Sequence, residues 1–331
     1  MSNPTLSRPG SDRDLASNPA TLGSGLRLRV ESRRSFLGGL GAGLALLAPV
    51  RAALIGSYIV GCYTRPWDQF ELGQALDGIA EAGYHWAGLM TAKGKSWVII
   101  TPQTTEVEAG KIGQQVRQRG LQVCSVYGDF SVANSRSTGR EQLRRLIDNA
   151  AACGSPELLL GGTAARELYD DYYGAIEEEC DHAETRRVGL SIKPHGGLNA
   201  TGAACREAIE RVGHPNFRLW YDPGNILYYS DGARDPLQDV LGVDGLVVGM
   251  SVKDFRPPKE VLVTPGTGEV NFPALFARLR LGGFTRGQLV VECTARGDFA
   301  AVTREARAAR AYVERLARGR AFDSLRSEPP P

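Results

Sequence analysis

The sequence predicts an α/β protein built on a single (β/α)8 barrel, the TIM barrel. Short apolar runs alternate with helix-length segments along residues 53–317 of the 331-residue chain. In the second half, four runs end in reactive residues, Lys193, Asp222, Lys253 and Glu292, spaced 29, 31 and 39 residues apart. Each interval has room for a loop, a helix and a return strand, and a barrel gathers its strand ends at one mouth. A doubly wound sheet is not expected, because no phosphate-binding glycine fingerprint follows the first strand.

The elements follow in order along the chain. The apolar runs predict eight strands, at 58–63, 85–90, 121–127, 157–160, 188–195, 217–222, 247–254 and 288–292. The second is weak because Gly88 interrupts it. Helices are predicted at 70–82, 105–119, 137–152, 169–187, 203–212, 236–241 (a short one), 272–281 and 303–317. Gly83 and Gly120 follow the first two, where a helix C-cap is expected.

The first 52 residues differ in composition from the rest. Arg33 and Arg34 precede an uncharged, glycine-rich run and the small residues Ala52 and Ala53. This order is typical of a twin-arginine export signal after a disordered leader, and it predicts a periplasmic protein that meets the membrane only through that signal. A buried or interfacial helix with two chance arginines is the alternative. At the other end, residues 318–331 are predicted to be a disordered tail.

Charge and cysteine content exclude several classes of function. The chain has a formal net charge of +2, but residues 1–52 hold seven arginines and three acidic residues, so the remainder is near −2. No basic tract is left to follow a nucleic-acid backbone, and no nucleic-acid partner is predicted. The six cysteines show no C-x-x-C pair, so a zinc finger is not expected. Cys62, Cys124 and Cys293 lie in predicted strands and are expected to be small buried thiols, with a disulfide as the alternative.

Alternation along the strands groups the reactive side chains. Lys193 and His195 point to the same side of their strand, as do Ser251 and Lys253. If Lys193 faces the barrel mouth, His195 does too, and Asp222 and Glu292 complete a cluster from neighbouring strands. Salt bridges or helix caps are the alternative for the acids, and a structural role is the alternative for His195.

Further residues are candidates for contact with a substrate. Asn225 follows Asp222 through a Pro-Gly pair that is predicted to turn the chain sharply at the rim. Tyr63 and Trp67 offer aromatic faces after the first strand, although each is as compatible with the core. Together with Lys253 they form the predicted substrate-binding set.

Six motifs in the late strands and loops carry a resemblance to a known family. They are Lys-Pro-His-Gly-Gly at 193–197, His-Pro-Asn at 214–216, Trp-Tyr-Asp-Pro-Gly-Asn at 220–225, Val-Lys-Asp-Phe at 252–255, Pro-Gly-Thr-Gly-Glu-Val at 265–270 and Val-Val-Glu at 290–292. The chain resembles, over roughly residues 55–317, the sugar phosphate isomerase/epimerase family with the xylose isomerase-like barrel. The resemblance implies one divalent metal held at the ends of the late strands, and proton movement next to a carbonyl through an enediol-like intermediate.

The resemblance carries over only in part to the metal ligands. Asp222 and Glu292 match two of the family's ligands, but Lys193 stands in place of a glutamate and Ser251 in place of a histidine. In one hypothesis His195, Asp222 and Glu292 still hold Mg²⁺ or Mn²⁺. In the other, the Lys193 ammonium takes the place of the metal and polarises a substrate oxygen, while Glu292 or His195 shuttles the proton.

These features predict an isomerase, epimerase or lyase that acts on a sugar or keto-sugar, with Lys193, His195 and Glu292 as catalytic residues. The alternative from another class is a non-catalytic periplasmic sugar-binding barrel that has lost its metal centre. A phosphodiesterase is disfavoured, because it would need a histidine-rich zinc cluster and the chain has four histidines. The sequence leaves the exact substrate and the oligomeric state open.

Overall fold

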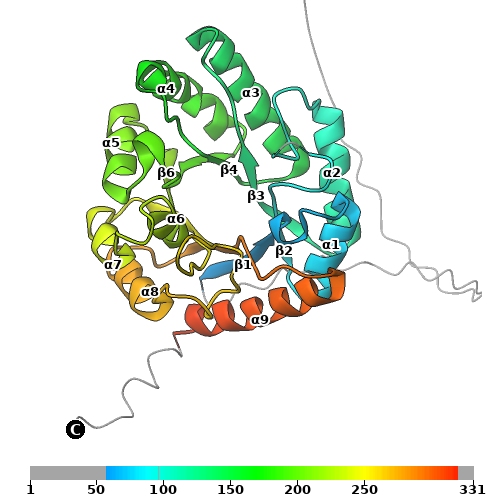
Figure 1. Cartoon of the computed structure of the whole chain (residues 1–331). Coiled ribbons are helices and arrows are strands. Elements are labelled where there is room, and N and C mark those ends of the chain that lie inside the picture. Colours follow the sequence, from blue (N-terminus) through cyan, green and yellow to red (C-terminus); the bar gives the residue numbers. More distant parts are fainter. Residues whose placement is uncertain (1–56, 96, 320–331) are drawn as a thin grey trace, which may run out of the picture. The chain divides into compact units, whose positions relative to one another are not determined.

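Eight parallel strands close into a barrel in the order β1 to β8, with β8 paired back to β1 (Figure 1). The structure is a computed structural model that describes residues 57–95 and 97–319. The strands are β1 Tyr58–Tyr63, β2 Trp86–Leu89, β3 Gln122–Gly128, β4 Glu157–Leu160, β5 Gly189–Ile192, β6 Phe217–Tyr221, β7 Val247–Val252 and β8 Gly287–Val291. The (β/α)8 prediction is therefore confirmed.

Helices surround this barrel on the outside, apart from the short helix α6, which lies at the barrel mouth (Figure 1). They are α1 Leu72–Glu81, α2 Glu106–Gln118, α3 Arg136–Cys153, α4 Tyr169–Thr185, α5 Gly202–Val212, α6 Pro223–Tyr228, α7 Pro236–Asp239, α8 Phe272–Leu281 and α9 Phe299–Ala317. Local sequence signals fix several ends. Thr105 and Glu108 form a capping box at the start of α2, and Gly154 ends α3 in the left-handed conformation.

Two hydrophobic layers hold the barrel together. Outward strand residues pack with the helices in a large core. A smaller cluster fills the barrel interior, and it includes Tyr63, Cys124, Leu159, Trp220 and Val290. All six cysteines are buried and free, which agrees with the role predicted for Cys62, Cys124 and Cys293 as small buried thiols.

Glycine in β2 has a packing reason. A Cβ on Gly88 would collide with the ring of Tyr63, so glycine makes room there for an aromatic side chain inside the barrel. Gly249 does the same for Trp220 from β7. The residue that weakened the prediction of the second strand is therefore one that the filled barrel requires.

Three kinds of difference from the prediction affect the late elements. The four late strands end one residue before Lys193, Asp222, Lys253 and Glu292, so these side chains start the loops. The Pro-Gly-Asn segment that was expected to be a tight turn forms the first turn of α6, because Asp222 caps it. The last helix starts at Phe299, four residues early, because Asp298 caps it.

The predicted export signal and most of the predicted tail, residues 1–52 and 318–331, lie outside the described residues, apart from Arg318 and Gly319. In residues 57–95 and 97–319, no helix has both the length and the apolar character needed to cross a membrane.

Candidate active site

Four charged side chains meet where the late strands end, at the centre of the barrel mouth. The Lys193 Nζ atom lies 3.1 Å from Asp222 Oδ2 and 2.8 Å from Glu292 Oε2. The Lys253 Nζ atom lies 2.8 Å from Asp222 Oδ2 and 2.8 Å from Glu292 Oε1. All four are almost completely buried. The two lysines thus bridge the two carboxylates, which completes the charge pairing that buried ions need.

Glu292 is the centre of this network. Its Oε1 atom accepts hydrogen bonds from Arg65 at 2.6 Å and from Lys253 at 2.8 Å. Its Oε2 atom accepts from Lys193 at 2.8 Å and from Ser251 at 2.6 Å. Burial alone would raise the pKa of Glu292, but Lys193, Lys253 and Arg65 together hold it well below its usual range. Glu292 is therefore a fixed anion whose oxygens are already occupied.

Helix α6 fixes the position of Asp222. The Oδ1 atom of Asp222 accepts the backbone N–H of Asn225 at 3.0 Å, which makes Asp222 the N-cap residue. The Asn225 side chain donates to the carbonyl of Pro194 at 2.7 Å and so ties α6 to the loop after β5. The short helix holds one carboxylate and the His195 loop in one arrangement.

The cluster carries a net positive charge. Lys193, Lys253 and Arg65 contribute three positive charges, and Asp222 and Glu292 contribute two negative ones. Burial acts to lower the pKa of Lys193, but Glu292 and Asp222 raise it above its ordinary value, so Lys193 stays an ammonium ion. The pKa of Arg65 is raised as well, since Cys293, Glu292 and Asp222 outweigh its burial.

His195 lies beside the cluster and stays neutral. Its ring is 6.2 Å from the ring of Tyr127 and 5.4 Å from that of Tyr229, measured between centroids. Burial, followed by the charges of Lys193 and Lys253, lowers its pKa to about 3. Gly196 has φ of 77°, and a Cβ there would collide with Tyr229, so glycine allows Tyr229 to approach.

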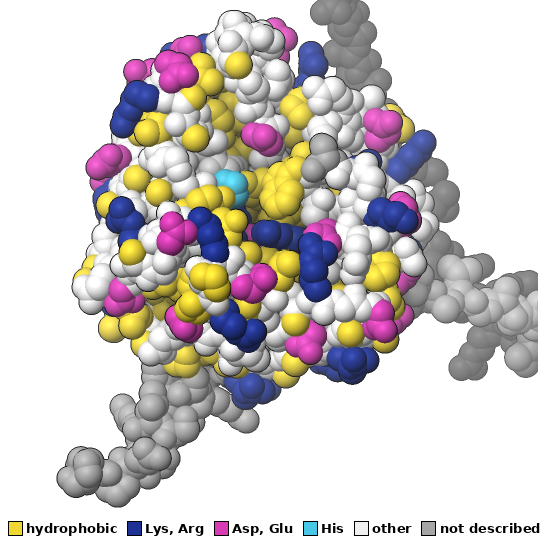
Figure 2. Space-filling model, viewed as in Figure 1, with side chains coloured by type: hydrophobic (Ala, Val, Ile, Leu, Met, Phe, Trp, Pro, Cys, Tyr) yellow, Lys and Arg dark blue, Asp and Glu magenta, His cyan; other side chains and the backbone are white. Residues whose placement is uncertain are grey.

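A cavity of about 210 Å³ opens above the cluster. Its lining residues are Arg65, Trp97, His195, Asn225, Tyr228, Tyr229, Lys253 and Val261. Figure 2 shows hydrophobic, histidine and basic side chains gathered at the centre of the face that Figure 1 presents. The cavity therefore reaches Lys253 and His195, while Lys193, Asp222 and Glu292 lie beneath it.

The predicted residues divide into three groups. His195, Asn225 and Lys253 line the cavity, and Lys193, Asp222, Ser251 and Glu292 form the buried network below. Tyr63 and Trp67 do neither, and the expectation that they bind substrate is corrected. Tyr63 is inside the barrel, where its hydroxyl accepts a hydrogen bond from Ser125 at 2.7 Å, and Trp67 packs against Gly78 of α1. Both side chains are fully buried. Tyr63 packs in the barrel interior and Trp67 packs in the core between the barrel and the helices.

Sequence reasoning missed Arg65. This residue opens a 3-10 turn, Arg65–Trp67, directly after β1, and its guanidinium lies 5.2 Å from the ring centroid of Trp97. A signal was present, because Thr64 and Arg65 follow the apolar run of β1 just as polar residues follow the late strands.

The donor set does not fit the expected metal. In the described part of the chain, the ring nitrogens of His195 and the carboxylate oxygens of Asp222 and Glu292 do not form a group within 4.8 Å. Both carboxylates are bridged by lysine ammonium groups, which repel a cation and cannot ligate one while protonated. The expected ligand set of His195, Asp222 and Glu292 is therefore not assembled.

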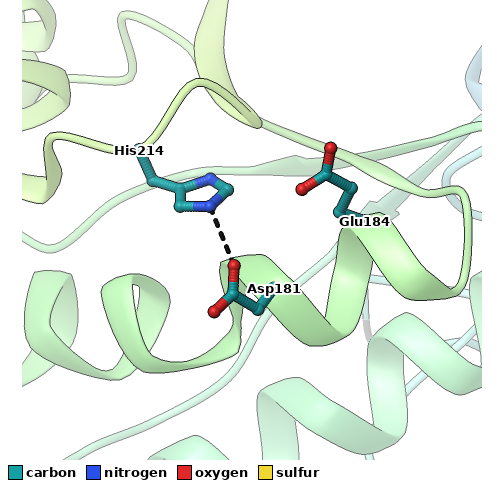
Figure 3. Close-up of side chains that lie close together, drawn as sticks. All are labelled: Asp181, Glu184 and His214. Carbon is teal, nitrogen blue, oxygen red and sulfur yellow. Dashed lines mark hydrogen bonds and ion pairs between the residues drawn. The ribbon is translucent and has the colours of Figure 1, made fainter.

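A second group with metal-binding side chains lies on the outside of the barrel. Asp181 and Glu184 of α4 and His214 before β6 come together there (Figure 3). The Nδ1 atom of His214 accepts the backbone N–H of Asn216 at 3.1 Å, so the neutral ring carries its proton on Nε2. That Nε2 faces Asp181 Oδ1 at 3.2 Å. The group is explained as an exposed hydrogen-bonded pair with a neighbouring acid.

Comparison with known proteins agrees with this architecture. The chain is 27% identical over 169 residues to the L-ribulose-5-phosphate 3-epimerase UlaE of Salmonella paratyphi C (strain RKS4594), a match that covers 47% of this chain and 56% of that protein. The chain thus spans about half the length of this curated relative.

Two solved structures share the fold. A xylose isomerase domain protein from Planctomyces limnophilus superposes with a TM-score of 0.63 at 19% identity, over 80% of this chain and 99% of that one. A D-psicose 3-epimerase from Clostridium cellulolyticum H10, solved with D-tagatose, gives a TM-score of 0.61 at 13% identity, over 78% and 99%. The family model described as "Xylose isomerase-like TIM barrel" matches residues 76–317. The chain therefore belongs to the xylose isomerase-like TIM barrel family.

Proposed function

We propose that the protein is a sugar or keto-sugar isomerase or epimerase that moves a proton next to a carbonyl without a divalent metal. The observation that carries the proposal is the bridging of Asp222 and Glu292 by Lys193 and Lys253. Membership of the family and the epimerase names of the relatives support the reaction class.

In this proposal His195 is the base. Glu292 is not available to accept a proton, because its two oxygens already accept four hydrogen bonds and it lies beneath the cavity. His195 is neutral and lines the cavity. It takes the proton from the carbon next to the carbonyl, and the electron pair of the broken C–H bond forms the C–C double bond of an enediolate. The negative charge that develops on the substrate oxygen next to the ring favours protonation of the imidazole.

Lys253 and Arg65 have the electrostatic role. Both line the cavity and both are held by Glu292, so their charges are already in place when negative charge develops on the carbonyl oxygen. Lys193 lies below them and acts as a positioning residue that holds the two carboxylates together. Delivery of the proton by His195 to the former carbonyl carbon, with transfer of the neighbouring hydroxyl proton to the other oxygen, gives an isomer. Protonation of the original carbon from the opposite face by solvent gives an epimer, whereas return of the proton from the same face regenerates the substrate.

Exchange of solvent deuterium tests the proposal. The purified protein, treated with EDTA, is incubated in deuterated water with D-psicose, D-tagatose, D-fructose or L-ribulose 5-phosphate, and incorporation is followed by NMR. We expect incorporation into at least one of them. We also expect its loss by a factor of about 10²–10⁴ in His195→Asn, the range for a general base. His214→Asn is the matched control, since His214 lies on the outer surface, and it should keep the rate.

Two results would contradict the proposal. Exchange that appears only after Mn²⁺ or Zn²⁺ is added, or a stoichiometric amount of either metal in the purified protein, would remove the metal-free mechanism. Specific binding of a sugar with no exchange would support the non-catalytic sugar-binding barrel instead.

The pH profile gives an independent check. Since the folded-state pKa of His195 is about 3, the neutral base is fully present above about pH 4. We expect the rate of exchange to show no histidine inflection between pH 5 and 8. An inflection near pH 6.5 that disappears in His195→Asn would contradict the assigned environment of this ring.

A further inference from the structure

A buried asparagine joins the ends of two neighbouring strands behind the cavity. Asn199 is 1% exposed, and its Nδ2 atom donates to the carbonyl oxygen of Lys193 at 2.7 Å and to that of Gly161 at 2.8 Å. Lys193 follows β5 and Gly161 follows β4, so one amide group connects the two loops. An asparagine amide has two N–H donors, and both are used here.

The backbone of the same residue holds His195. The N–H of His195 donates to the carbonyl oxygen of Asn199 at 3.0 Å, and the side chain of Asn225 donates to the carbonyl of Pro194 at 2.7 Å. An asparagine therefore binds a backbone group in each of the residues 193–195. The described residues make no hydrogen bond to the His195 ring, which packs against two tyrosine rings. The position of the ring thus depends on its backbone and on this packing.

Glycine after β4 makes room for this asparagine. Gly162 has φ of 84°, and a Cβ on it would collide with the amide group of Asn199. A larger residue at this position would push the amide away from the two carbonyls. The loop after β4 is therefore shaped to admit a side chain that belongs to the loop after β5.

We infer that Asn199 is a positioning residue for the proposed proton transfer. It does not line the cavity, and it acts by holding the loop of residues 193–199 so that the His195 ring stays at the cavity. The inference rests on the proposed function, because His195 is the base in it. A base must lie within hydrogen-bond reach of the proton that it takes, and a displacement of about 1 Å can slow a reaction about 100-fold.

Two asparagine substitutions separate positioning from general stability. Asn199→Ala removes both donors behind the cavity. Asn216→Ala is the matched control, because Asn216 Nδ2 also donates to two carbonyls, those of Cys180 at 3.4 Å and Val188 at 3.0 Å, at the opposite end of the barrel where β6 begins. Both variants should melt several degrees lower. For the fastest of the four ketoses named above, only Asn199→Ala should lower kcat of deuterium exchange, by about 10- to 100-fold, with KM within about two-fold.

The His195 ring gives a readout that needs no substrate. Burial, then Lys193 and Lys253, lower its pKa to about 3, with Arg65 acting in the same direction and Glu292 against it. In the native protein and in Asn216→Ala the ring should therefore stay neutral between pH 5 and 8. In Asn199→Ala it should move towards water and titrate in this range. Nitrogen-15 NMR of the labelled proteins follows the ring, and the spectrum of His195→Asn identifies its signals.

Hydrogen exchange in the native protein keeps the inference testable if Asn199→Ala does not fold. The backbone N–H of His195 should then exchange as slowly as those of β5, because the loop opens only with the barrel. Exchange of this N–H at the rate of an exposed loop would overturn the inference. An equal fall of kcat in the two asparagine variants would also overturn it, as would a native rate and a neutral His195 ring in Asn199→Ala.

Failure of this inference differs from failure of the proposed function. If no sugar exchanges deuterium but the His195 ring titrates in Asn199→Ala and not in Asn216→Ala, only the proposed function is overturned. If the native protein exchanges deuterium into a sugar and Asn199→Ala does so at the same rate, only the inference is overturned.

Discussion

Glu292 shows how its neighbours decide what one carboxylate can do. In isolation, a glutamate at a barrel mouth is suited to be a metal ligand or a base. Here its two oxygens accept hydrogen bonds from Arg65, Lys193, Ser251 and Lys253. These donors stabilise the anion so strongly that proton transfer to it is unfavourable. His195, whose ring lines the cavity, is therefore the group in our proposal that accepts a proton, rather than Glu292 beneath it.

Glu157 presents the opposite case among buried acids. It begins β4, and strand alternation places its side chain inside the barrel, because Leu158 packs outward and Leu159 inward. Burial raises its pKa to about 7. In the described part of the chain, its Oε1 atom has no hydrogen-bond partner. The group is thus easier to protonate in the folded than in the unfolded chain.

We predict that stability falls as the pH rises because of Glu157. The folded pKa of about 7 is above the unfolded value of 4.5, so protonation stabilises the fold at low pH. That contribution is lost progressively between about pH 4.5 and 7. Glu157→Gln removes the titration and should be more stable than the native protein at pH 8, by up to about 3 kcal/mol.

Urea unfolding at pH 4.5, 6 and 8 measures this difference. At pH 4.5 the two proteins should differ little, because the native side chain is then protonated and resembles glutamine, and this serves as the internal control. A variant that is less stable than the native protein at pH 8 would show that a partner stabilises the Glu157 carboxylate.

At the scale of elements, the loop between β7 and α8 depends on one side chain. The Oδ1 atom of Asp254 accepts the N–H groups of Phe255 at 2.8 Å and Val270 at 3.0 Å. Its Oδ2 atom accepts those of Gly266 at 2.9 Å and Gly268 at 2.8 Å. Asp254 is fully buried, and these four donors satisfy its charge. The loop that these hydrogen bonds close places Val261 in the lining of the cavity.

We therefore predict that Asp254→Asn loosens this loop. The amide nitrogen of asparagine would face two N–H groups, so two of the four hydrogen bonds to a charged acceptor are lost. At about 1.5–3 kcal/mol for each such bond, the free energy of unfolding should fall by about 3–6 kcal/mol. Hydrogen exchange should rise most in residues 255–270 and less in α4.

A nearby surface pair provides the control for the Asp254 substitution. Asp231 is 74% exposed and pairs with Lys259 of the same loop at 2.7 Å. Because exposed ion pairs contribute little, Asp231→Asn should leave both exchange in the loop and the midpoint of unfolding unchanged. Equal effects of the two substitutions would mean that the buried carboxylate does not organise the loop.

At the scale of the whole molecule, the barrel and its cluster could be predicted, because both follow from periodicity. Alternation along each strand and the closure of the sheet bring Lys193, Asp222, Lys253 and Glu292 together. The late strands are shorter than predicted, because an apolar run does not show at which residue the hydrogen bonding between neighbouring strands ends. The export signal remains a prediction, since residues 1–56 lie outside the described part.

The sequence could not show which side chains near the mouth are buried by packing and which reach the cavity. Tyr63 and Trp67 each stand two residues from Arg65 in the sequence, yet both are buried, one in the barrel interior and the other against α1. Arg65 between them reaches Glu292. Side chains in the 3-10 turn Arg65–Trp67 do not alternate as they do in a strand, so strand alternation cannot predict which way they point. The first turn of α6 was missed because Pro-Gly-Asn suits a tight turn as well as a helix that an aspartate caps.

The site as a whole should accept a metal if the family's two missing ligands are returned. Lys193 Nζ and Ser251 Oγ lie 2.8 Å and 2.6 Å from the same oxygen of Glu292, so side chains at these two positions converge. The double variant Lys193→Glu, Ser251→His would place three carboxylates and an imidazole there. Without metal it should be less stable than the native protein, because like charges are then buried together.

We expect Mn²⁺ to stabilise this double variant and not the native protein. A metal at one hundred times its dissociation constant adds about 2.7 kcal/mol, which raises the melting temperature of a domain of this size by several degrees. The matched control is Lys193→Gln, Ser251→Asn, which removes the lysine without supplying the ligands and should not respond. An equal response of the native protein to Mn²⁺ would show that Lys193 does not exclude the cation. An equal response of the glutamine and asparagine variant would show that the lysine alone, and not the ligand set, decides whether a metal binds.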